Sequence, residues 1–286
     1  MTVLDPSMVC KLGKFLYGLK QASRQWYSKL SDALYSRGYI VSRNDYSLFL
    51  KHSSSSIVIV AVYVDDVLVT GNDTTEITSL KSFLDQQFRI KDLGILHYFL
   101  GLEVLRESAG VIITQRKFVV DMLTEFDSHD LSPVSAPLHV PCKITSNTRN
   151  PLSNPLVYCR LVGKLNFLTN TRPDLSYSVQ LLSQFMHSPC EGHFQAALHV
   201  LRYVKGTVGQ GLFMSTTSDF KLHAFCDRDW AACPESRRSI SGFIVLLGSS
   251  LLCWKSKKQP TVSLSSTKAE YRSMRRVVAE LAWLSR

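Results

Sequence analysis

The chain has 286 residues, 45% hydrophobic and 20% charged, a composition that excludes a disordered or fibrous protein. Its 33 lysines and arginines against 23 aspartates and glutamates leave a formal charge of +10, which favours nucleic acid or an anionic surface as the partner. The seven cysteines form no Cys-x-x-Cys pair, so neither a disulfide framework nor a zinc cluster is predicted. The longest apolar run, 57–64, is too short to span a bilayer and the N-terminus has no signal-peptide pattern, so an intracellular chain, in cytoplasm or nucleus, is expected.

The first part of the chain predicts a helix followed by a hairpin. Apolar residues recur at helical spacing between 26 and 34. The β-branched runs at 57–64 and 67–70 are then separated only by Asp65 and Asp66. We therefore expect a hairpin with two carboxylates at its tip.

The next segments predict a helix, a second hairpin and a linker. Asp73-Thr-Thr-Glu76 has the spacing of a capping box ahead of an apolar stripe. A hairpin is expected from 99 to 114, with its turn at 108–110. Half of the ten prolines lie among polar residues between 127 and 156, which indicates a linker.

Helical patterns and then a strand-rich segment come after the linker. Pro173-Asp174 suits the first turn of a helix, and apolar spacing predicts another helix over 193–204. Strands are expected near 222–226, 241–247 and 251–254. Thr267-Lys-Ala-Glu270 has the spacing of a capping box for a final helix. The inner side of that helix is predicted to carry Met274, Val277, Val278, Leu281 and Leu284.

The adjacent carboxylates of Asp65 and Asp66 have two interpretations. Their mutual repulsion and partial desolvation call for a counter-charge, which a hard divalent cation such as Mg²⁺ supplies through oxygen ligands. The alternative is a surface turn, because aspartate tolerates turn geometry well. Spacing alone favours the surface turn.

Larger motifs change that balance, because their order and spacing resemble the reverse transcriptase of copia-type LTR retrotransposons. The first set is Tyr17-Gly-Leu-Lys-Gln-Ala22, Arg24-Gln-Trp-Tyr27, Tyr63-Val-Asp-Asp66, Lys91-Asp-Leu-Gly94 and Phe99-Leu-Gly-Leu-Glu103. Later motifs resemble the connection and ribonuclease H portion of the same polyprotein: Thr171-Arg-Pro-Asp174, Leu201-Arg-Tyr-Val-Lys-Gly-Thr207, Asp227-Arg-Asp-Trp230 and Ser265-Ser-Thr-Lys-Ala-Glu-Tyr271. The resemblance covers essentially the whole chain.

The resemblance implies a polymerase palm that uses two Mg²⁺ or Mn²⁺ ions. Asp65 and Asp66 would join a third aspartate from an earlier strand, and two cations about 3.5–4 Å apart would act on the primer hydroxyl and the departing pyrophosphate. That third aspartate is expected upstream of Leu16 and is missing, since Leu4-Asp5-Pro6 lacks the expected strand. The implied partners are RNA, an RNA–DNA hybrid and dNTP.

The same resemblance implies nucleic-acid contacts in the first part of the chain. Tyr63 would lie beside the palm carboxylates. The basic and aromatic stretch at 11–29 itself predicts phosphate contact for Lys20 or Arg24, and the alternative is that these basic side chains face solvent on a helix. Phe99 and Gly101 belong to a segment similar to the primer-grip hairpin, although a plain amphipathic hairpin fits that segment nearly as well. For the neighbouring Trp26, packing is favoured over stacking on a base.

In the last part of the chain, the resemblance implies two carboxylates of a ribonuclease H site, Asp227 and Glu270. That chemistry needs several carboxylates around two Mg²⁺ ions, and the later ones are expected beyond Arg286. The alternative for Glu270 is a helix-capping role with Thr267, worth about 0.5–2 kcal/mol. Lys268 brings positive charge near the expected metal position, which weakens cation binding.

The predicted fold is α/β in the broad sense, α+β, with four parts. These are a partial reverse-transcriptase palm with its primer-grip hairpin at 1–126, a proline-rich linker at 127–156, a helical connection at 157–215, and an incomplete ribonuclease H-like mixed sheet plus helix at 216–286. The predicted function is that of a reverse transcriptase and ribonuclease H fragment of a Pol polyprotein, catalytically incomplete by itself. The alternative is a domesticated nucleic-acid-binding or protein-interaction scaffold without catalysis.

Overall fold

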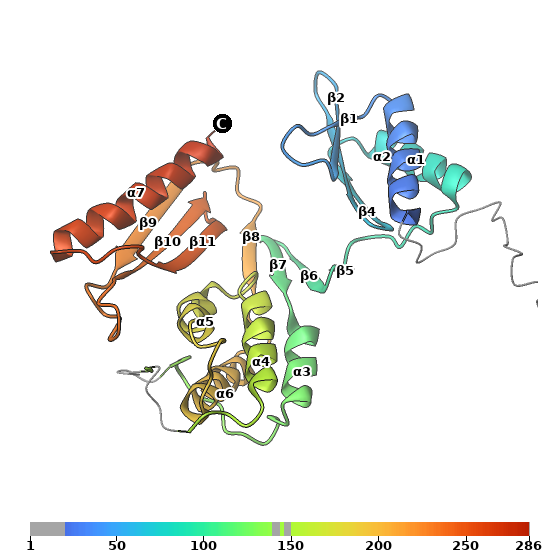
Figure 1. Ribbon diagram of the computed structural model, residues 1–286. Helices are drawn as coiled ribbons and strands as arrows, with labels where there is room; N and C mark the ends of the chain where they lie inside the picture. The colour runs from blue at the N-terminus through green and yellow to red at the C-terminus, as the bar shows by residue number, and fades with distance from the viewer. Residues whose placement is uncertain (1–20, 139–143, 146–149, 286) are drawn as a thin grey trace, which may run out of the picture. The chain divides into compact units, whose positions relative to one another are not determined.

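The computed structural model describes residues 21–138, 144–145 and 150–285. These residues form an α+β structure with three antiparallel sheets (Figure 1), which confirms the broad fold class. The chain divides between Gly94 and Ile95 into two compact units, so the segment at 95–126 belongs to the second unit and not to the first. Among the described residues, no helix combines the length and apolar character needed to cross a membrane.

The first unit pairs two helices with a sheet in the order β1-β2-β3-β4. Its elements are α1 (Ala22–Ser36), β1 (Ile40–Val41), β2 (Leu48–His52), β3 (Ile57–Tyr63), β4 (Asp66–Gly71) and α2 (Thr74–Phe88). The predicted β-branched runs become β3 and β4, and their register pairs Tyr63 with Asp66. The tip of this hairpin is therefore the Val64-Asp65 turn.

The helices of the first unit cover one face of its sheet. Val58, Val60 and Val62 alternate along β3 and are all buried, together with Leu30 from α1 and Leu80 from α2. Side chains alternate between faces along a strand, so this pattern turns one face of β3 toward the helices. The packing leaves the end of the β3–β4 hairpin outside the core.

The predicted capping box at the start of α2 forms only in part. Asp73 accepts a hydrogen bond from the backbone N–H of Glu76 at 2.9 Å, as an N-cap should. The Glu76 carboxylate instead pairs with Lys51 at 3.0 Å and Arg37 at 3.3 Å. It thereby ties α2 to β2 and to the residue immediately after α1.

The second unit begins with a sheet in the order β5-β6-β7-β8 and a group of helices. Its first elements are β5 (Tyr98–Phe99), β6 (Leu102–Glu107), β7 (Gly110–Thr114), α3 (Arg116–Glu125), α4 (Pro155–Leu168), the 3-10 turn η1 (Pro173–Leu175), α5 (Ser176–Ser183), α6 (Glu191–Gly206) and β8 (Leu212–Ser215). The predicted second hairpin is present as β6 and β7, joined by the turn 108–109. An extra two-residue turn joins β5 to β6, where Leu100 and Gly101 have φ of 51° and 83°.

The predicted linker packs against helix α6 wherever it is described. Arg202 donates to the carbonyl of Ser132 at 2.8 Å, and Lys205 donates to the carbonyl of Leu131 at 2.7 Å. Leu138 and Ile144 are buried in the core that α3 to α6 share. The described part of the linker is thus fixed to the helices, and it ends at Asn154, the N-cap of α4.

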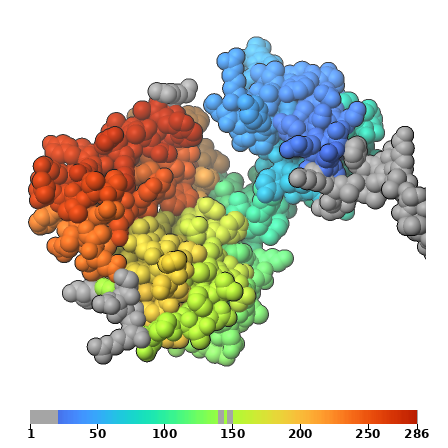
Figure 2. All heavy atoms as spheres, in the orientation of Figure 1, coloured from blue at the N-terminus to red at the C-terminus, as the bar shows by residue number. Residues whose placement is uncertain are grey.

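The last part of the second unit is a three-stranded sheet with one long helix. Its elements are β9 (Leu222–Arg228), β10 (Ile240–Leu247), β11 (Ser250–Lys258) and α7 (Ser266–Leu284), with strand order β11-β10-β9. The described sheet is antiparallel throughout, where a mixed sheet was predicted, because a two-residue turn joins β10 to β11. Figure 2 shows this part, orange to red, lying directly against the yellow helices of the same unit.

Two predictions for α7 are wrong. Its N-cap is Ser265, whose hydroxyl accepts from the backbone N–H of Lys268 at 3.2 Å, so Thr267 and Glu270 form no capping box. The buried face holds Ala269, Ser273 and Val277, with Leu281 and Leu284 packed behind them. Met274 and Val278 are exposed, because each follows a residue of the buried stripe by one position and so points away from the sheet.

Candidate functional site

The first candidate site is the tip of the β3–β4 hairpin. Tyr63, Val64, Asp65 and Asp66 are all exposed there. Tyr63 and Asp66 form a cross-strand pair, while Asp65 lies in the turn. Directly paired residues share a face of the sheet, so Tyr63 and Asp66 lie side by side, on the face opposite to that of Val62.

The backbone of this turn is strained and is held from outside. Val64 has φ of 53°, a left-handed conformation that costs a β-branched residue about 1–2 kcal/mol. The indole N–H of Trp26 donates to the carbonyl oxygen of Val64 at 2.6 Å. The Trp26 ring also packs edge-on against Phe88 with centroids 5.1 Å apart. Packing, as predicted for Trp26, thus comes with a hydrogen bond that helps to fix the Asp65 turn.

The two aspartates can supply oxygen ligands to a hard cation. Within residues 21–138, 144–145 and 150–285, neither Asp65 nor Asp66 takes part in an ion pair, so their charge is not offset by a basic side chain. The same described residues contain no group of three or more histidine, cysteine or acidic side chains able to hold a metal. The donors fit Mg²⁺ as two ligands of a larger set. Asp5 lies outside the described residues.

The residues expected to contact nucleic acid are distributed over both units. Arg24 is exposed on the first turn of α1, and Tyr63 is exposed beside Asp66. Phe99 ends strand β5 of the second unit, and Gly101 lies in the turn between β5 and β6. Lys20 lies outside the described residues.

The second pair of candidate carboxylates is Asp227 on β9 and Glu270 on α7, and the alternation of side chains along β9 keeps them apart. Asp227 lines a cleft of about 740 Å³ between the sheet and the segment around Pro173. Glu270, on the first turns of α7, forms an ion pair with Arg228 at 3.2 Å. Successive side chains on a strand point to opposite faces, so Arg228 and not Asp227 reaches Glu270. A guanidinium beside Glu270 disfavours a cation there, so these carboxylates do not fit a metal site in this structure.

Asp229 has a structural position that the sequence did not indicate. Its carboxylate accepts from the backbone N–H of Ile240 at 2.7 Å, which closes the loop between β9 and β10. Burial raises the pKa of this carboxyl group, against the lowering effect of its backbone hydrogen bonds. The nearby Trp230 indole donates to the carbonyl of Ser263 at 3.1 Å, which ties the same loop to the segment before α7.

Comparisons with known proteins agree with the motifs. Residues 3–140 match the family model described as reverse transcriptase (RNA-dependent DNA polymerase). The chain is 30% identical over 280 residues to the putative transposon Ty5-1 protein YCL074W of Saccharomyces cerevisiae, covering 97% of this chain and 91% of that protein. It is 43% identical over 279 residues to the retrovirus-related Pol polyprotein from transposon RE1 of Arabidopsis thaliana, covering 98% of this chain and 19% of that polyprotein. This chain belongs to the copia-type retrotransposon Pol family.

Other comparisons define how much of such a polyprotein is represented. The similar Pol polyprotein from transposon TNT 1-94 of Nicotiana tabacum is 35% identical over 290 residues, covering 98% of this chain and 22% of that polyprotein. The chain therefore spans about a fifth of the length of the copia-type polyproteins RE1 and TNT 1-94. No solved structure matches this chain.

Within this copia-type chain, sequence reasoning located the carboxylates but not what surrounds them. The Tyr-Val-Asp-Asp motif marked the hairpin, whereas the bond from Trp26 to Val64 joins residues 38 positions apart. A tryptophan in a helix so far from the turn along the chain gives no local signal of that bond. The ion pair between Arg228 and Glu270 likewise depends on how α7 packs on β9.

Proposed function

We propose that this chain is a nucleic-acid-binding section of a copia-type reverse transcriptase, in which Asp65 and Asp66 supply two ligands of the palm cation site. The observation that carries the proposal is the hairpin that presents both aspartates at a turn fixed by Trp26. Reverse transcriptase membership and the net charge of +10 support nucleic acid as the partner.

The roles of the hairpin residues follow from their chemistry. A bound divalent cation would supply charge stabilisation for phosphoryl transfer. Asp65 and Asp66 would hold it through carboxylate oxygens, and the exposed ring of Tyr63 would lie against a base or sugar. Arg24 would bind a backbone phosphate, and Phe99 and Gly101 would contact the primer strand. Trp26 would be a positioning residue that acts through the Val64 carbonyl.

We further propose that 216–286 corresponds to the opening part of a ribonuclease H-like domain and does not cleave RNA in this chain. Asp227 and Glu270 occupy the positions that the family motif assigns to two carboxylates. Arg228 offsets the charge of Glu270 at 3.2 Å, and the described residues contain no metal-binding cluster around them. A site that needs several converging carboxylates is not supported by this arrangement.

Binding of cation at the hairpin can be tested without an activity assay. Mn²⁺ added to isotope-labelled chain should broaden the amide resonances of Asp65 and Asp66 in NMR spectra. The double change Asp65→Asn and Asp66→Asn should abolish that broadening, and Asp85→Asn on α2 should leave it intact. Equal broadening in all three proteins would refute the assignment of the ligands.

Nucleic-acid binding and catalysis need separate measurements. We expect a labelled RNA–DNA hybrid to bind with an affinity that falls as salt rises, because phosphate contacts release counterions. We expect neither primer extension on an RNA template with Mg²⁺ or Mn²⁺ nor cleavage of the hybrid. Extension that Asp65→Asn abolishes would show a complete polymerase site, and absence of hybrid binding at low salt would overturn the nucleic-acid role.

A further inference from the structure

The last sheet of the second unit carries an apolar row on the face that α7 leaves uncovered. The register of β9, β10 and β11 places Phe225, Ile244 and Trp254 side by side across the three strands. Their neighbours along each strand pack in the core under α7, so alternation turns this row to the opposite face. Phe225 is 59% exposed and Ile244 is 39% exposed. The sheet therefore presents an aromatic and aliphatic surface outside its core.

A second row beside it forms the floor of the cleft that Asp227 lines. Asp227 pairs with Gly242, and Gly242 pairs with Ser256. Among the described residues, a Cβ atom added at Gly242 would meet only the backbone oxygen of Lys255 within 4 Å, at 3.8 Å, so the space above this glycine is open. The segment of η1 and α5 around Tyr177 lies across the cleft, whose volume is about 740 Å³.

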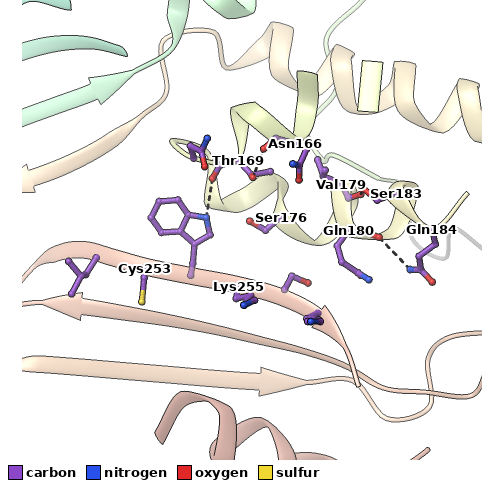
Figure 3. A pocket seen from close by; sticks show the side chains of 14 residues that line it. Asn166, Thr169, Ser176, Val179, Gln180, Ser183, Gln184, Cys253 and Lys255 are labelled. Atoms are coloured by element: carbon purple, nitrogen blue, oxygen red, sulfur yellow. Dashed lines mark hydrogen bonds between the residues drawn. The ribbon is translucent and has the colours of Figure 1, made fainter. Parts of the chain in front are cut away.

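The two sides of this cleft are joined by contacts inside the second unit. The indole N–H of Trp254 donates to the carbonyl of Thr169 at 3.0 Å, which ties β11 to the end of α4 (Figure 3). In the same view Cys253 points to the other side of β11, away from the helices. Helix α5 is anchored from behind by Val179 and Leu182, which are buried in the helical core. The cleft is therefore part of the folded unit.

Three carboxylates make this cleft acidic, although the chain as a whole carries a formal charge of +10. Asp174, Asp227 and Asp229 all line it. Arg172 pairs with Asp174 at 2.7 Å, and the backbone N–H of Ile240 donates to Asp229. In the part of the chain that the structure describes, Asp227 takes part in no ion pair. Its charge is therefore open to a ligand.

Two basic residues beside the cleft have their side chains on the other face of the sheet. The guanidinium of Arg228 pairs with Glu270 of α7 at 3.2 Å. Lys255 is paired with Phe243, which is buried in the core under α7, so its ammonium group lies on that face too. The carboxylates that remain in the cleft repel a phosphate group and attract a cation, whose charge the faces of aromatic rings also stabilise.

We propose that this cleft binds a linear aliphatic polyamine, with an ammonium group on Asp227 and the methylene chain along Phe225 and Ile244. The inference goes beyond the nucleic-acid role and does not depend on it. An organic cation is favoured over a hydrated metal ion, because methylene groups gain from contact with the apolar row. The described residues also contain no group of three metal-binding side chains. Asp174 and Asp229 lie on other elements around the cleft, which fits a ligand whose charges are spaced along a chain.

The test is isothermal titration calorimetry of spermidine into the full chain, freed of nucleic acid, at about 0.05 M salt, where screening is weak. Asp227→Asn removes the partner of the ammonium group and should lower the affinity about 2- to 5-fold. Asp227→Glu keeps the charge and should restore most of that loss. The matched control, Asp121→Asn, removes an exposed carboxylate of α3 in the same unit and should keep the wild-type affinity.

A further variant tests the shape of the cleft without changing any charge. Gly242→Val fills the open space on the floor, and its backbone is not in the left-handed region, so valine fits the strand. Contact with about two methylene groups would be lost, and the affinity should fall roughly 10-fold. Circular dichroism and thermal unfolding check that each variant keeps the fold.

Two other probes separate the polyamine from other occupants. Mg²⁺ at matched ionic strength should displace spermidine no better than K⁺, and displacement by Mg²⁺ alone would overturn the proposal in favour of a metal ion. A trilysine peptide carries the same ammonium groups on a peptide backbone. Trilysine that binds more tightly than spermidine, and loses affinity in Gly242→Val, would show a protein segment as the occupant. Equal losses in Asp227→Asn and Asp121→Asn, or unchanged affinity in Asp227→Asn and Gly242→Val, would leave only diffuse attraction and overturn the site.

Discussion

Arg172 offers a quantitative test of how the second unit is held together. Its side chain is the largest of the fully buried ones among the described residues. The guanidinium binds both carboxylate oxygens of Asp174, at 3.0 and 2.7 Å, and also donates to the carbonyl and hydroxyl of Thr207, at 2.9 and 2.8 Å. It lies 5.6 Å from the ring centre of Tyr203, whose hydroxyl donates to Asp174 at 3.0 Å. The network joins η1 to the end of α6.

Asp174→Asn keeps the size of the side chain but removes the charge that compensates Arg172. Breaking a buried pair from one side costs about 3–5 kcal/mol, because the remaining charge stays desolvated. The side chain of Asp174 is 26% exposed, while that of Arg172 is 1% exposed. Water can therefore reach part of the altered side chain. We expect the free energy of unfolding to fall by about 3 kcal/mol, the lower end of that range.

Thermal and urea unfolding followed by circular dichroism measure this loss. For a unit of this size, about 3 kcal/mol corresponds to a fall of roughly 6–12 °C in the melting temperature. The control is Glu125→Gln, since Glu125 forms surface ion pairs with Arg160 at 2.9 Å and with Lys164 at 2.6 Å, and the side chain of Arg160 is 57% exposed. That change should cost at most about 1 kcal/mol. Equal small losses in both variants would refute the view that Arg172 depends on Asp174.

Three other predictions concern single side chains. Trp26→Phe removes the hydrogen bond to the Val64 carbonyl but keeps an aromatic ring. The free energy of unfolding measured in urea should fall by about 1 kcal/mol, and amide hydrogen exchange in the turn should become faster. Unchanged exchange would argue against the positioning role of Trp26. Burial lowers the pKa of His193, so the folded state binds fewer protons and stability should fall as pH drops below about 6.5. His193→Gln should flatten that fall, and an equally steep fall in the variant would assign it to other groups. Ser265→Ala should lower the free energy of unfolding by about 1 kcal/mol, and Thr267→Ala by at most about 0.5 kcal/mol, both measured by urea unfolding. A larger loss for Thr267→Ala would show that Thr267 is the N-cap.

Local patterns predicted the first hairpin and the start of α2, where the determining interactions lie close in sequence, but they misplaced the start of α7. The β-branched runs on either side of Asp65 and Asp66 gave β3 and β4 with their turn in place. Asp73 acts as an N-cap because a cap needs only the backbone of the next turn. The start of α7 was misplaced by two residues, since Ser265 and Thr267 carry equivalent hydroxyl groups and local spacing does not choose between them.

The amino-acid sequence by itself determined the family, the element types and the position of the paired aspartates, because motif order and side-chain periodicity are properties of the chain. Tertiary structure decided which partners these residues meet. Trp26 reaches Val64, and Glu270 pairs with Arg228. These contacts depend on how separate elements pack against one another, and packing depends on burial and shape over the whole unit, which spacing along the chain does not encode.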